Sequence, residues 1–134
     1  MKHLTPLESW QYLQAQQQSG KPALFVDVRM EVEYLYVGHP PGVVHIAWYE
    51  YPEMQAHPER FVAQVRRETQ DTTRPIVLIC RSGKRTVDAG HALEAAGFTE
   101  VVNVLHGFEG ELDEHFKRGT LSGWRFDGLP WEQM

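Results

Sequence analysis

IVLICRSGKRT, at residues 76–86, joins a short apolar run to the only cysteine of the chain and then to a cationic loop. A continuous apolar run of this length, bounded by turn residues, is typical of a strand buried on both faces of a parallel sheet. The residues from Thr86 to about Ala96 predict a helix that stops at Gly97. The stretch therefore predicts a strand–loop–helix unit with Cys80 at the carboxyl end of the strand.

The same alternation continues on both sides of this unit. Thr5-Pro6-Leu7-Glu8 is a capping box, which predicts a helix that runs to about Ser19. Strands that alternate with helices indicate an α/β domain with a mainly parallel central sheet flanked by helices. The other strands are predicted at residues 23–26, 43–47 and 100–105, and the other helices at residues 31–37, 58–67 and 109–117.

Length and composition narrow the function classes. A chain of 134 residues suits one domain, which we assign to residues 1–117. The net charge of -5 argues against nucleic acid as the main partner, and a single cysteine excludes an internal disulfide. The sequence shows neither a secretory signal nor an apolar run long enough to span a bilayer, so we expect a cytoplasmic protein with no membrane partner.

The tail at residues 118–134 is irregular and rich in aromatic residues. Trp124, Phe126 and Trp131 lie among glycines and a proline, which argues against a regular element. We expect these aromatic side chains to pack the tail on the same domain, with packing against a second copy of the chain as the alternative.

The loop after Cys80 has the composition of an anion site. Ligands of open α/β sheets bind outside the carboxyl ends of the strands, where Cys80 is expected. Three cations, the loop N–H groups and the start of the next helix would together favour the thiolate over the thiol. A cysteine at a strand end is often a small buried hydrophobe. Here the adjoining cations favour a nucleophile, because core packing has no use for them.

Residues 80–86 resemble the active-site loop of single-domain rhodaneses, which are sulfurtransferases. A second stretch resembles the upstream signature of that family, at Asp27-Val28-Arg29, Glu33-Tyr34, Gly38-His39, Gly42 and His45-Ile46. The resemblance covers most of residues 5–117. Two departures are His106-Gly107, where the family usually has a Gly-Gly pair, and the tail, which matches no part of the family pattern.

The resemblance implies a three-layer rhodanese-like fold and transfer of sulfane sulfur through a Cys80 persulfide. The donor would be thiosulfate or a similar small anion, and the acceptor cyanide, a thiol or a protein that accepts sulfur, with no metal and no cofactor. The substrate-binding residues would be Arg81, Ser82, Gly83, Lys84, Arg85 and Thr86. The structural signature would be Asp27, Arg29, Glu33 and His39, with the arginine paired to one or both carboxylates.

Other functions are weighed against this one. A rhodanese-like domain can also serve as a regulatory or sulfur-carrying interaction module with little turnover. Phosphatase or arsenate reductase activity is disfavoured, since related cysteine phosphatases place an arginine six positions after the cysteine, and here that position is Thr86. A metal site at Glu33, His39 and His45 is less favoured than ordinary loop hydrogen bonds. His106 and the aromatic stretch Trp48–Tyr51 are assigned structural roles, although both follow strands and could rim the pocket.

Overall fold

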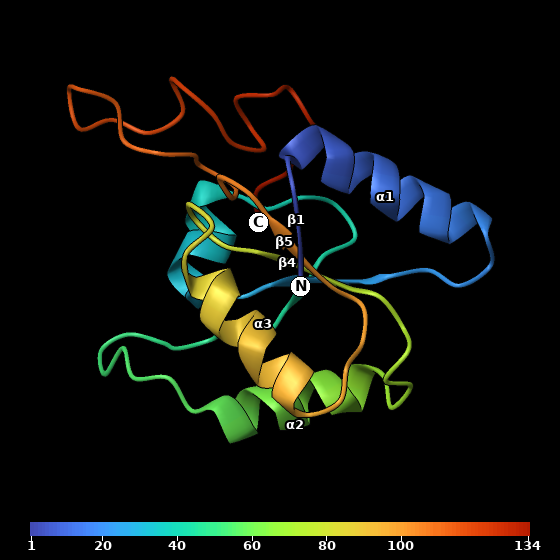
Figure 1. Cartoon of the computed structure of the whole chain (residues 1–134). Coiled ribbons are helices and arrows are strands. Elements are labelled where there is room, and N and C mark those ends of the chain that lie inside the picture. The colour runs from blue at the N-terminus through green and yellow to red at the C-terminus, as the bar shows by residue number, and fades with distance from the viewer.

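The computed structural model describes residues 1–134 as a five-stranded, wholly parallel sheet with helices on both faces (Figure 1). The strand order is β1-β5-β4-β2-β3, so β4, which carries Cys80 at its end, lies in the centre. The strands are β1 (Lys2–Leu4), β2 (Leu24–Asp27), β3 (Val44–His45), β4 (Ile76–Ile79) and β5 (Val101–Val104). The helices are α1 (Pro6–Gln18), the short π-helical segment η1 (Glu33–Val37), α2 (Pro58–Glu68) and α3 (Arg85–Ala95).

The central strands are buried on both faces, as their apolar runs predict. Along β4, Ile76, Leu78 and then Cys80 pack in one cluster with side chains of α2 and α3. Val77 and Ile79 point to the other face, where α1 and the tail cover them. This period of two follows from the pleat of the strand. It places Cys80 on the α3 side of the sheet.

The helix boundaries follow local chemistry. Thr5 Oγ1 accepts the Glu8 N–H at 3.2 Å, and Glu8 Oε1 accepts the Thr5 N–H at 2.9 Å, which confirms the capping box. In α2 the buried residues Phe61, Val62 and Val65 form the stripe that faces the sheet. No helix combines the length and the apolar character that a membrane span needs.

Two predictions about elements differ from the structure. Strand β1 is missing from the sequence prediction, because Lys2–Leu4 has no apolar run and is recognisable only through its pairing with β5. The helix predicted at residues 109–117 is wrong. Gly110 takes a φ of 82°, and the Asp113 carboxylate accepts the N–H groups of His115 and Lys117, which closes a turn instead of a helix.

The tail contributes to the core on the α1 side. Trp124 is fully buried, with its ring 5.5 Å from that of Phe25 and 5.9 Å from that of Trp10. Its indole Nε1–H donates to the Pro130 carbonyl at 2.7 Å, so its polar atom is satisfied. The boundary between domain and tail at residue 117 stays a prediction. Substitution of Trp124 measures how strongly the tail contributes to stability.

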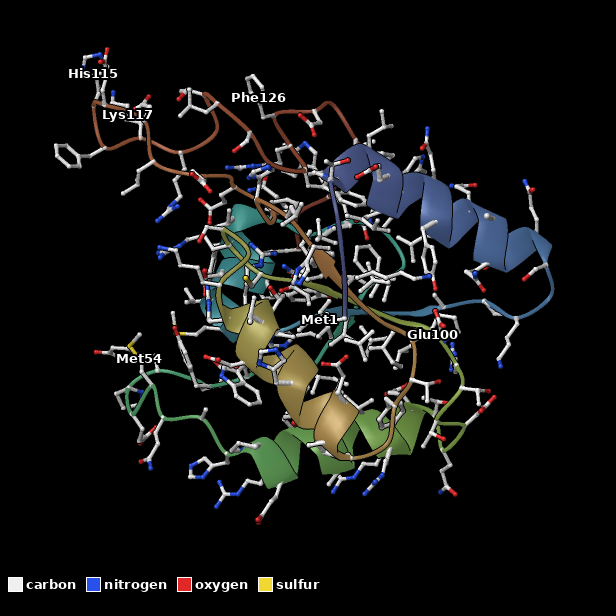
Figure 2. The ribbon with its side chains drawn as sticks, viewed as in Figure 1. Met1, Met54, Glu100, His115, Lys117 and Phe126 are labelled. Carbon is white, nitrogen blue, oxygen red and sulfur yellow. The ribbon has the colours of Figure 1, made fainter.

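We expect Trp124→Ala to lower the free energy of unfolding by about 3–5 kcal/mol, because it removes a large buried side chain. Phe126→Ala is the matched control, since Phe126 is half exposed on the outer side of the tail (Figure 2). Its effect should stay within about 0.5 kcal/mol. Denaturant unfolding of both variants measures the difference. If Trp124→Ala lowers the free energy of unfolding as little as the control does, burial of Trp124 adds no stability.

Candidate active site

Cys80 lies where β4 ends, and its side chain is enclosed by the loop that follows. The residue is 1% exposed. Its Sγ accepts the backbone N–H of Gly83 at 3.1 Å and lies 3.6 Å from Thr86 Oγ1. The chain therefore curls around the sulfur, with a backbone donor from the middle of the loop directed at it.

The loop keeps unused hydrogen-bond donors. Apart from Gly83, the N–H groups of Ser82, Lys84, Arg85 and Thr86 take part in no hydrogen bond within the protein. No side chain caps the N-terminus of α3, which starts at Arg85. Free N–H groups at a helix N-terminus form a site for an anion.

The segment after β5 holds the loop from the neighbouring strand. The Phe108 N–H donates to the Cys80 carbonyl at 2.7 Å, and the Glu109 N–H donates to the Arg81 carbonyl at 2.9 Å. Gly107 makes this approach feasible, because a Cβ there would overlap the carbonyl oxygen of Cys80. His106, beside it, is partly exposed, and its Nδ1 lies 3.7 Å from Glu111 Oε1.

A polar chain behind the loop is missing from the sequence prediction. Thr86, fully buried, donates from Oγ1 to Asn103 Oδ1 at 2.5 Å. The Asn103 side-chain nitrogen in turn lies 3.1 Å from His3 Nδ1. The sequence does hold one indication of this polar chain, which is Asn103 itself, the single amide side chain in the apolar strand β5. This chain fixes the hydroxyl that lies nearest the sulfur.

Arg85 is occupied by a carboxylate. Its Nη1 and Nη2 donate to Glu33 Oε1 and Oε2 at 2.7 and 2.9 Å, and both side chains are nearly buried. Burial alone would raise the pKa of Glu33, but the hydrogen bonds and charge of Arg85 lower it overall. Burial alone would lower the pKa of Arg85, but Glu33 raises it. Arg85 therefore ties the loop to η1.

The upstream signature forms a brace under the same end of the sheet. Arg29 and Asp27 are fully buried, with Arg29 Nη2 2.6 Å from Asp27 Oδ2. Arg29 also donates to the Gly38 carbonyl at 2.5 Å. The histidines of the signature make loop hydrogen bonds, His39 Nδ1 with the Tyr34 carbonyl and His45 Nε2 with that of Arg29. The arginine thus pairs with one of the two carboxylates, and Glu33 pairs with Arg85.

The exposed cations of the loop are Arg81 and Lys84. Lys84 and Ser82 line a hollow of about 270 Å³. Its other wall comes from the segment between β5 and the tail, through Glu111 and Leu112, and from Arg118 at the start of the tail. Like Asn103, Arg118 is not predicted as a site residue, because no sequence pattern indicates that it lies near the loop.

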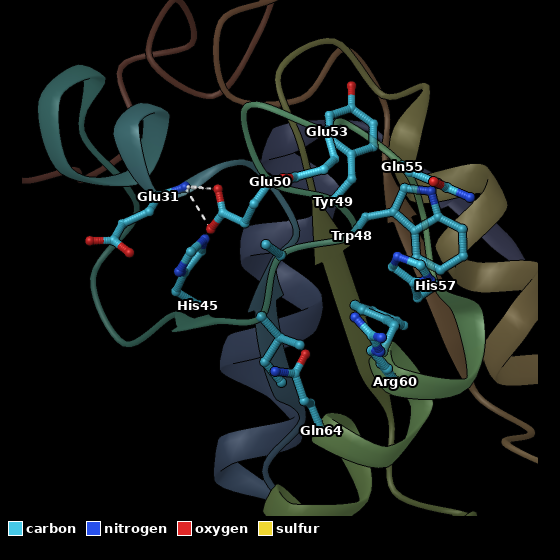
Figure 3. Close-up of a pocket in the computed structure, with 13 residues that line it drawn as sticks. Glu31, His45, Trp48, Tyr49, Glu50, Glu53, Gln55, His57, Arg60 and Gln64 are labelled. Carbon is cyan, nitrogen blue, oxygen red and sulfur yellow. Dashed lines mark hydrogen bonds between the residues drawn. The ribbon is translucent and has the colours of Figure 1, made fainter.

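A larger cavity, of about 430 Å³, lies between the 46–57 segment and α2 and contains no residue of the loop (Figure 3). Trp48 is buried there, edge-on to Phe61 at 5.3 Å, as the packing interpretation predicts. Tyr49 also lines this cavity, and its ring lies 5.5 Å from the guanidinium of Arg85. Within the aromatic stretch, Tyr49 thus contacts the Arg85–Glu33 pair, whereas Tyr51 is exposed.

Comparison with known proteins identifies the class. The chain matches the family of rhodanese-like domains over residues 9–113, and it belongs to the rhodanese family. The crystal structure of Rv0390 from M. tuberculosis is similar over 100% of this chain and 98% of that chain, with 36% identity and a TM-score of 0.85.

More distant relatives include one that is named for its activity. The thiosulfate sulfurtransferase GlpE of Haemophilus influenzae is 24% identical over 109 residues, which cover 81% of this chain and 86% of that protein. The uncharacterized protein RC0915 of Rickettsia conorii is 28% identical over 120 residues, which cover 85% of this chain and 86% of that protein.

We expect Glu33→Gln to lower the free energy of unfolding by about 3 kcal/mol at neutral pH, because it leaves the Arg85 charge nearly buried and unbalanced. The folded-state pKa of Glu33 is lowered, so its contribution is complete above the ordinary value of 4.5. It is lost as the pH falls through the lowered value.

The difference between wild type and Glu33→Gln should therefore shrink in acid, as measured by denaturant unfolding across pH. Glu31→Gln, an exposed change in the same segment, is the control and should cost at most about 0.5 kcal/mol at any pH. A difference that stays constant into acid would contradict the ion-pair assignment.

Proposed function

We propose that this protein is a sulfurtransferase that carries sulfane sulfur as a persulfide on Cys80. The observation that carries the proposal is the sulfur at the end of β4 with the Gly83 N–H directed at it and further free N–H groups along the loop. These donors favour a negative charge on the cysteine sulfur, or on a sulfur atom attached to it. Membership of the rhodanese family supports the same reaction.

The reaction is two displacements on sulfur. The Cys80 thiolate attacks the outer sulfur of thiosulfate, a new S–S bond forms, and the old S–S bond breaks with its electron pair leaving on sulfite. A nucleophilic acceptor then attacks the terminal sulfur of the persulfide, and the electron pair of the broken bond returns to Cys80 as the thiolate. With cyanide as acceptor the product is thiocyanate, and with a thiol it is a new persulfide. No oxidant or reductant is consumed.

The two exposed cations of the loop suit an anionic donor. Arg81 directly follows Cys80, and Lys84 lies at the start of α3. Their charge offsets the repulsion between a thiolate and a dianion. Arg85 acts differently from Arg81 and Lys84, since its ion pair with Glu33 positions the loop. The name of the Haemophilus influenzae relative favours thiosulfate as donor, and the cellular acceptor would be a thiol, on a small molecule or a protein.

The direct test is the intact mass of the protein after incubation with thiosulfate and removal of excess donor. Wild type should gain one sulfur atom, and cyanide should remove it. Cys80→Ser should gain none while it keeps the wild-type fold by circular dichroism. A sulfur gain in Cys80→Ser would place the nucleophile elsewhere, and no gain in wild type would reject thiosulfate as donor.

We expect Arg81→Ala to reduce kcat/KM for thiosulfate by about fivefold, because it removes one exposed charge that attracts the dianion. The same variant should change kcat/KM for an uncharged organic trisulfide much less. Arg67→Ala, which removes an exposed charge from α2, is the matched control and should leave both values unchanged. Equal losses with both donors would show that Arg81 does not act on donor charge.

A further inference from the structure

We propose that Arg118, in the tail, forms with Lys84 a subsite for the charged end of the sulfur donor. The inference rests on the proposed function and adds a specificity-determining residue to it. Arg118 lies beyond residue 113, where the match to the rhodanese family ends. Arg118 is therefore the one residue of the proposed subsite that lies outside the family match.

The proposed subsite is the hollow of about 270 Å³ beside the loop. Ser82 and Lys84 line it from the cysteine loop, Leu112 lines it from the segment after β5, and Arg118 lines it from the start of the tail. Arg118 is partly buried, and its Nη1 donates to the Gly110 carbonyl at 2.8 Å. A guanidinium has five N–H donors in a planar fork, so most of its donors stay available to a ligand.

Gly110, in the segment between β5 and the tail, connects Arg118 to the residue next to Cys80. The Gly110 N–H donates to the Arg81 carbonyl at 3.2 Å, while the Gly110 carbonyl holds Arg118. Gly110 has a φ of 82°, and a Cβ there would overlap the carbonyl oxygen of Ser122, where the tail crosses back. Only a glycine fits this crossing. Arg118 is thus linked through one residue to the backbone of the cysteine loop.

The charges in the hollow favour an anion. Lys84 and Arg118 contribute two positive charges against the single carboxylate of Glu111, which is exposed and 3.7 Å from His106 Nδ1. Arg85 cannot serve here in the same way, because Glu33 occupies it. The cations that line the hollow are therefore Lys84 and Arg118.

The ligand class is a small oxyanion that carries sulfur, such as thiosulfate. The planar guanidinium matches two oxygens of a sulfonate-type group, and Lys84 adds a point charge. Such a group would be held at the hollow, beside Ser82 and Lys84 of the loop that follows Cys80. The negative charge of Glu111 opposes binding of an anion. A variant that removes this charge should therefore bind thiosulfate more tightly, whereas loss of Arg118 should weaken binding.

The test is a thiosulfate titration of the Cys80→Ser protein, monitored through the NMR amide shifts of Ser82 and Gly83. We expect Arg118→Ala in this background to raise Kd about fivefold, and Glu111→Gln to lower Kd about threefold. Arg118→Lys should recover part of the loss. Lys117→Ala is the matched control, because Lys117 lies at the outer end of the tail loop, lines none of the hollow and should leave Kd unchanged (Figure 2).

Glu111→Gln tests whether the anion binds in the hollow, and Arg118→Lys, which keeps the positive charge, separates a charge contribution of Arg118 from a purely structural one. The proposal is overturned if Cys80→Ser does not bind thiosulfate, or if Arg118→Ala and Lys117→Ala have the same Kd. It is also overturned if Glu111→Gln leaves Kd unchanged. The sulfur gain of the wild-type protein is measured separately, so a failure of the transfer reaction is distinguishable from a failure of this subsite.

Discussion

The hydrogen bonds between the segment after β5 and the carbonyls of Cys80 and Arg81 are the constraint on which the site depends. They fix the end of β4 against the adjacent strand, with the Phe108 N–H on Cys80 and the Glu109 N–H on Arg81. The N–H groups of Ser82, Lys84, Arg85 and Thr86 that follow have no partner within the protein. The ends of β4 and β5 thus hold a loop whose N–H groups are largely free.

Two arginines hold this end of the sheet in place through different partners. Arg29 is fully buried with Asp27, and its guanidinium lies 4.6 Å from the centre of the Phe108 ring. Arg85 is nearly buried with Glu33 and connects the loop to η1. Buried pairs of this kind cost much to break from one side, since the remaining charge is left unbalanced. The loop is therefore held at both ends, and preorganised donors of this kind are what electrostatic stabilisation of a charged sulfur needs.

The sequence predicts the local parts of this fold well and the long-range parts poorly. The run of β4, the capping box of α1 and the helix after the loop follow from periodicity and caps, and the structure confirms them within a residue or two. Strand β1 has no such signal, because only its pairing with β5 defines it. The segment after β5 looks helical by composition, but Gly110 and the Asp113 turn prevent a helix.

In the candidate site, too, local features are predictable from the sequence and long-range contacts are not. Cys80 and the loop are adjacent in sequence, so their proximity is predictable, whereas the partners that set the role of each cation come from far along the chain. Glu33 occupies Arg85 from 52 residues away. Asn103 orders Thr86 from β5, and the tail brings Arg118 beside Lys84. None of these pairs has a spacing that a sequence pattern could reveal.

The most direct test of the central claim is a crystal structure of the wild-type protein after treatment with thiosulfate. The account predicts one extra sulfur atom bonded to Cys80 Sγ, within hydrogen-bond distance of free N–H groups from Ser82 to Thr86. A persulfide sulfur that points away from these N–H groups, or that sits on no residue of this loop, would contradict it.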